Sequence, residues 1–68
     1  MAPILIINQI RGNDENAMNY RITITQGADV ITTDEELLSN LKDSIPYKRG
    51  IIEITRVSNN IWEIKTSK

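Results

Sequence analysis

The 68-residue sequence contains no cysteine and no histidine. Without cysteine the chain has no disulfide, no thiolate nucleophile and no zinc or iron–sulfur site built on cysteine ligands. Without histidine it lacks the commonest general base and the commonest metal ligand of proteins. We therefore expect a protein that is not an enzyme and that binds no cofactor.

Aromatic residues are scarce, and the charges nearly balance. The chain has one Trp, two Tyr and no Phe, and its eight Lys and Arg face nine Asp and Glu, which gives a net charge of −1. Proteins that bind nucleic acid usually carry a clustered excess of Lys and Arg. The balance argues against that class of function.

Long hydrophobic runs are also missing from the N-terminal region, where the apolar run 4–7 has four residues. A signal peptide needs an apolar segment of about 7–15 residues, and a membrane span needs about 20. We therefore expect a cytoplasmic protein with no membrane contact. The length favours a single domain, residues 1–68, with a small core.

Two segments in the N-terminal half read as strands. Residues 3–11 are rich in β-branched aliphatics on both faces, which is typical of a strand that is covered on both sides or lies at an interface. Residues 19–25 alternate between apolar and polar side chains and predict a half-buried strand. The polar segment 12–16 joins them as a turn. A short third strand at 30–32 is an open alternative.

A helix start is the strongest local pattern. Thr33 and Glu36 have the spacing of a capping box, in which each side chain accepts a hydrogen bond from the backbone N–H of the other residue. The acids at 34–36 also lie at the positive end of the helix dipole. Pro46 would end the helix. The apolar residues of the segment form one stripe along it: Leu37, Leu38, Leu41 and Ile45.

Residues 51–57 and 61–66 predict a second hairpin. A three-residue loop over 58–60 would place Arg56 opposite Trp62, which permits a cation–π contact. The same loop would pair Val57 with Ile61. A two-residue Asn-Asn turn is equally allowed and would shift the register. A Trp in this position is more typical of a small buried core than of a binding site.

These elements predict an α+β fold with the order β-β-(β)-α-β-β: an antiparallel sheet of four to five strands with one helix on one face. Large aliphatic side chains should then be exposed on the helix-free face, and such patches often mark interaction sites. The alternative is an ordinary mixed face of an antiparallel sheet, which needs no partner. The residues that we expect at an interface are Leu5, Ile7, Ile51, Val57 and Ile61.

We therefore expect a small non-catalytic protein–protein interaction module, such as an accessory, regulatory or inhibitor protein. It would bind a protein partner or a second copy of itself, as a homodimer, through the helix-free face or by strand addition at a sheet edge. On this interpretation, Ile7→Glu should abolish association and leave the fold intact.

Nucleic-acid binding is the alternative function, through Tyr47, Lys48, Arg49 and Arg56. Arginine can hold a phosphate with two hydrogen bonds, and an aromatic ring can stack on a base. The more ordinary interpretation of the loop 47–50 is a solvated connection from helix to strand, whose cations complement the helix C-terminus. The acidic clusters lack the spacing of a calcium loop, so no metal site is expected.

Overall fold

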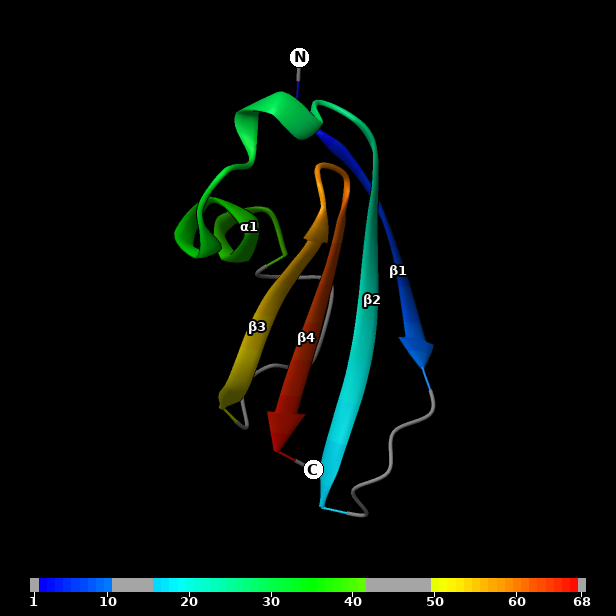
Figure 1. Cartoon of the computed structure of the whole chain (residues 1–68), viewed down its shortest axis with the longest axis vertical. Coiled ribbons are helices and arrows are strands. Elements are labelled where there is room, and N and C mark those ends of the chain that lie inside the picture. Colours follow the sequence, from blue (N-terminus) through cyan, green and yellow to red (C-terminus); the bar gives the residue numbers. More distant parts are fainter. Residues whose placement is uncertain (1, 11–15, 42–49, 68) are drawn as a thin grey trace.

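The computed structural model describes residues 2–10, 16–41 and 50–67. They form a four-stranded antiparallel sheet with one α-helix between the second and third strands (Figure 1). This confirms the predicted α+β fold. In chain order the elements are β1 (Ile4–Ile10), β2 (Ala17–Gln26), the 3-10 helix η1 (Ala28–Val30), α1 (Asp34–Leu41), β3 (Ile51–Ser58) and β4 (Ile61–Ser67).

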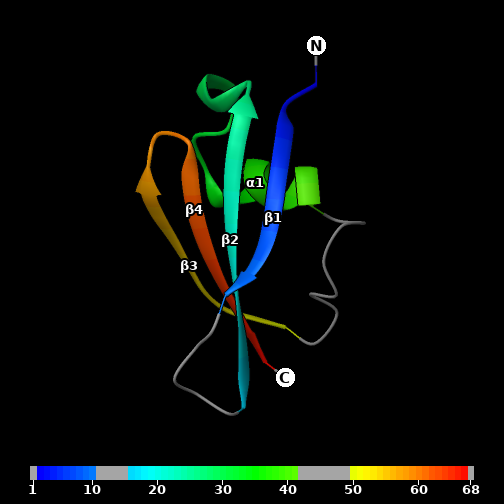
Figure 2. The ribbon, with the colours of Figure 1, turned by 90° about the vertical axis from the view of Figure 1, so that its right-hand side faces the viewer.

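The strand order is β1-β2-β4-β3, so β2 and β4 are central and β1 and β3 are the edges. Figure 2 shows α1 behind the sheet, with the opposite face turned toward the viewer. We call that opposite face the open face. The two layers are held together by Leu37 and Leu41 of α1, which are buried in the same cluster as core residues of β2 and β4.

The optional strand at 30–32 does not form. Gly27 turns the chain at the end of β2 with a φ of 79°, a conformation that glycine adopts without strain. A Cβ atom at Gly27 would lie 3.0 Å from the Cα of Pro3, so only glycine fits there without a shift. The turn leads into η1, and Ile31 then points into the core, fully buried.

The core lies between α1 and the central strands. Its residues on β2 are Tyr20, Ile22 and Ile24, which confirms the predicted alternation of this strand. Burying each large aliphatic or aromatic side chain contributes about 1.5–3 kcal/mol. The other members of the core cluster are Ile31, Leu37, Leu41, Trp62 and Ile64.

The β3–β4 hairpin has the shorter of the two turns that the sequence allowed. The turn has two residues, Asn59 and Asn60, and Ser58 pairs with Ile61, so the three-residue loop was wrong. The register shifts between Arg56 and Ser58, which leaves Val57 as the extra residue of a bulge. The predicted pair of Val57 with Ile61 is therefore wrong, while the predicted pairing holds from Arg56, opposite Trp62, to Glu53, opposite Lys65. A second register shift follows between Glu53 and Ile51.

The predicted capping box begins α1. The backbone N–H of Glu36 donates to Thr33 Oγ1 at 3.2 Å, and the backbone N–H of Thr33 donates to Glu36 Oε1 at 3.1 Å. Thr32 extends the motif, since its backbone N–H and hydroxyl donate to the same carboxylate oxygen at 3.1 and 2.9 Å. These bonds hold the pKa of Glu36 below its ordinary value, and the Thr32 hydroxyl is the largest cause.

Thr33→Ala should lower the free energy of unfolding by about 1 kcal/mol, because it removes the cap of a helix that is only eight residues long. Ser39→Ala, at an exposed position of the same helix, is the matched control. Urea denaturation followed by circular dichroism measures both. Equal stability of the Thr33 variant and the wild type would place the helix start elsewhere.

Glu36→Gln keeps a side-chain oxygen for the cap but removes the charge. A lowered pKa in the folded state means that the Glu36 charge stabilises the fold above the ordinary carboxyl pKa of 4.5, and that this stabilisation is lost as pH falls through the lowered value. The wild type should therefore exceed the variant in stability at neutral pH, and the difference should shrink in acid. Thermal unfolding across pH tests this, with Glu35→Gln as control. A pH-independent difference would contradict it.

Candidate functional site

The open face carries three rows of side chains that run across the strands. Directly opposed residues of an antiparallel sheet point to the same face, so the register defines each row. The first row is Ile6, Thr23, Ile61 and Ser58; the second is Asn8, Arg21, Glu63 and Thr55; the third is Ile10, Asn19, Lys65 and Glu53. The first row is largely apolar, and the other two are largely polar.

The apolar row extends into a patch that we call the apolar corner, made up of Ile4, Ile6, Thr23, Val57 and Ile61. Ile4, Ile6 and Val57 are 48%, 49% and 54% exposed. Ile4 lies two residues before Ile6, at the register shift that begins β1, and Val57 lies at the bulge next to Ser58. The corner therefore reaches across the sheet and includes the edge strand β1.

The charged side chains of the open face lie next to residues of opposite charge. Arg21 Nη2 lies 3.1 Å from Glu63 Oε2, with the two side chains 50% and 37% exposed. An ion pair with this exposure contributes at most about 1 kcal/mol. Lys65 lies opposite Glu53 in the register. In the described part of the chain, this half of the face thus presents alternating charges instead of a basic patch.

The two edges of the sheet differ in how they resist pairing with another strand. Natural edge strands are commonly protected by charges, by bulges or by proline. β3 carries Glu53 and Arg56 and two register shifts, after Ile51 and after Arg56. β1 has five aliphatic residues and two amides in seven positions, with no charge, proline or glycine, and one register shift at its start, between Ile4 and Leu5. Within the described residues, β2 is its only strand neighbour.

Three of the predicted interface residues lie on the wrong side of the sheet. Leu5 and Ile7 pair with Ile24 and Ile22 and pack against the core, partly buried, and Ile51 also packs against it. For Leu5 and Ile7 the prediction failed because β1 is aliphatic at both odd and even positions, so the pattern carries no information on which set is buried. For Ile51 it failed because of the register shift between Ile51 and Glu53. Val57 and Ile61 do belong to the open face.

The sequence prediction missed Ile4 and Ile6, which replace Leu5 and Ile7 on that face. The sequence did contain one signal for an exposed apolar set on β1, because residues 3–11 were predicted to be apolar on both faces. In a two-layer domain with one helix, such a strand must expose one of its two apolar sets. Choosing the set required the register with β2.

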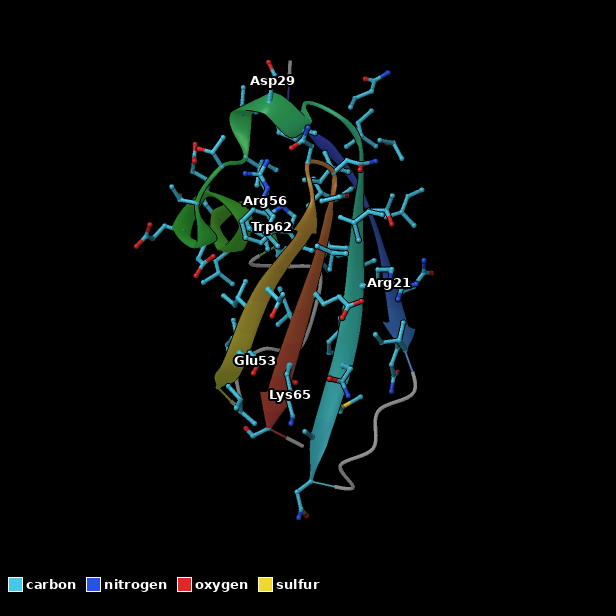
Figure 3. The ribbon with its side chains drawn as sticks, viewed as in Figure 1. Arg21, Asp29, Glu53, Arg56, Trp62 and Lys65 are labelled. Carbon is cyan, nitrogen blue, oxygen red and sulfur yellow. The ribbon has the colours of Figure 1, made fainter. Side chains whose placement is uncertain are left out.

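Arg56 lies on the helix side, over the ring of Trp62, and Figure 3 shows the two residues together beside α1. The guanidinium carbon is 5.3 Å from the ring centroid, which confirms the predicted cation–π contact. Trp62 is 2% exposed, so its role in the core is also confirmed. The other residues of the nucleic-acid alternative, Tyr47, Lys48 and Arg49, lie outside the described residues, as do Ile45 and Pro46.

Within the described residues, no three acidic side chains come close enough to hold a metal ion. No helix in the same ranges has the length and apolar character to cross a membrane. Comparison of the chain with models of known protein families, with curated proteins and with solved structures found no match.

Two adjacent residues of β1 test the face assignment. Ile7→Glu should lower the free energy of unfolding by about 2 kcal/mol or more, because it places a carboxylate against the core. Ile6→Glu, on the open face, should change it by about 0.5 kcal/mol or less. Chemical denaturation at low protein concentration compares the two without a contribution from association. The reverse order of stabilities would overturn the register of β1 on β2.

Proposed function

We propose that the chain is a small non-catalytic protein–protein interaction module that binds an extended strand along the outer edge of β1. Its biological role would be that of an accessory, regulatory or inhibitor protein. The observation that carries the proposal is the outer edge of β1, which has no charged residue, no proline and no second strand neighbour among the described residues, and which is continuous with the apolar corner of the open face.

Strand addition uses the backbone of the edge strand first. Alternate residues of β1 direct their backbone N–H and C=O groups away from β2, where an incoming strand can bond to them. These bonds provide affinity with little dependence on sequence, and side-chain contacts provide selectivity. On the open face, the selective contacts would come from Ile4 and Ile6, each of which would gain about 1 kcal/mol from covering its exposed half.

The chemistry of the preferred partner follows from β1 and its surroundings. β1 has no ionisable side chain, so it offers nothing to a charged strand, and a β-branched aliphatic strand would match its surface. Such an apolar contact should persist as salt rises, whereas binding to nucleic acid should weaken steeply. The module needs no disulfide for this role, which is compatible with the reducing cytoplasm.

A displayed library of random peptides about as long as β1 tests this function directly. The immobilised wild type should select peptides that alternate β-branched aliphatic residues, and high salt should not release them. Ile6→Lys should lose this binding, because a charge then lies on the edge strand. Val30→Lys is the matched control, since Val30 is 53% exposed and lies in η1, away from the sheet.

Selection of acidic or basic peptides would contradict the proposal. Equal binding by Ile6→Lys and the wild type would also contradict it, because the peptide would then lie elsewhere on the surface.

A further inference from the structure

We infer that the strand that fits β1 is β1 of a second copy of this chain, paired antiparallel about a two-fold axis. The two four-stranded sheets would then become one continuous sheet. This inference rests on the proposed function, strand addition at β1, and names its partner.

The charges of the chain permit this pairing. β1 contributes no charged side chain, so two copies bring no like charges together at the junction. The net charge of −1 adds almost no long-range repulsion between copies. β3 is less suited to pair with itself, because it carries Glu53 and Arg56 and a register shift near each end, whereas β1 has one shift, at Ile4.

The side-chain pattern of β1 selects one register. Opposed residues of an antiparallel pair share a face, so the two-fold axis must lie midway between one residue and the same residue of the partner subunit. An axis at Ile6 pairs Ile6 with its own copy on the open face and Leu5 with Ile7 of the partner subunit on the helix side. An axis at Ile7 instead sets Leu5 against Gln9 of the partner subunit, and Ile6 against its Asn8. An axis at Leu5 also opposes aliphatic side chains, but it overlaps only residues 4–6 of the two strands. The Ile6 axis overlaps residues 4–8, with aliphatic pairs at its centre and Ile4 opposite Asn8 of the partner subunit at each end, and the longer overlap with its aliphatic pairs stabilises the junction more.

The Ile6 register would also bury apolar side chains of β1 that are partly exposed in a single copy. Leu5 and Ile7 pack against the core but remain partly exposed, and each would gain a neighbour across the junction. Ile6, 49% exposed in one copy, would be covered by its counterpart. A domain of this size has a small core and gains proportionally more from association than a large one.

Sedimentation equilibrium over a wide concentration range tests for the dimer. The wild type should pass from monomer to dimer as its concentration rises. Ile6→Lys should weaken dimerisation about tenfold or more, because two lysines would face each other at the axis. Val30→Lys adds the same charge outside the sheet and should dimerise like the wild type. A dimer that survives Ile6→Lys would use another surface and would overturn the inference.

The absence of cysteine makes a cross-linking test of the register unambiguous. In the Ile6 register, Ile6→Cys brings two thiols directly opposite each other, at a Cα separation that suits a disulfide. This variant should oxidise to a covalent dimer, whereas Val30→Cys should stay monomeric under the same conditions. Preferential cross-linking in a mixture of Ile6→Cys and Asn8→Cys would instead assign the axis to Ile7 and overturn the Ile6 register.

The outcomes separate this inference from the proposed function. A wild type that stays monomeric at every concentration, while aliphatic peptides still bind at β1, overturns the homodimer and leaves strand addition standing. Loss of both overturns both. If Ile6→Lys does not fold, hydrogen exchange of the wild type decides: the β1 amides should become more protected as concentration rises, and unchanged protection would overturn the dimer.

Discussion

The pairing of Leu5 with Ile24 and of Ile7 with Ile22 decides which side of β1 faces the helix and which side faces outward. Side chains alternate along a strand with a period of two, so a slip of one residue would exchange the two sets completely. In the observed register, Leu5 and Ile7 extend the core beneath α1. Ile4 and Ile6 are thereby left on the open face, and the apolar corner exists as a consequence of this choice.

The helix can cover its side of the sheet because local and tertiary interactions support it together. An isolated helix of eight residues is marginal in water. Here the Glu36 carboxylate accepts hydrogen bonds from Thr32 and Thr33 at the helix start, while Leu37 and Leu41 are fully buried against the sheet. The cap fixes where the helix begins, and the two leucines fix which side of it meets the sheet.

The bulge at Val57 has two effects on the β3 edge. It absorbs the extra residue that the two-residue Asn59-Asn60 turn creates, so Arg56 keeps its position over Trp62. It also breaks the regular ladder of backbone groups along the outer strand, which discourages pairing there. β1 has no charge and a single register shift, at Ile4, whereas β3 has two charges and a shift near each end. This difference between the two edges is the main reason to expect a partner at β1.

The local patterns of the sequence determined the strand alternation over Tyr20, Ile22 and Ile24 and the helix start at Thr33 and Glu36, because both depend on residues close together in the chain. They also determined the α+β class. The face of β1 and the turn between β3 and β4 were decided only in the tertiary structure. β1 is aliphatic at both odd and even positions, and the Asn-rich turn accepts two loop lengths, so neighbouring residues favour neither outcome. The register of β1 on β2 selects the face of β1, and the pairing of Arg56 with Trp62 and of Ser58 with Ile61 fixes the turn. The first of these moved the candidate site from Leu5 and Ile7 to Ile4 and Ile6.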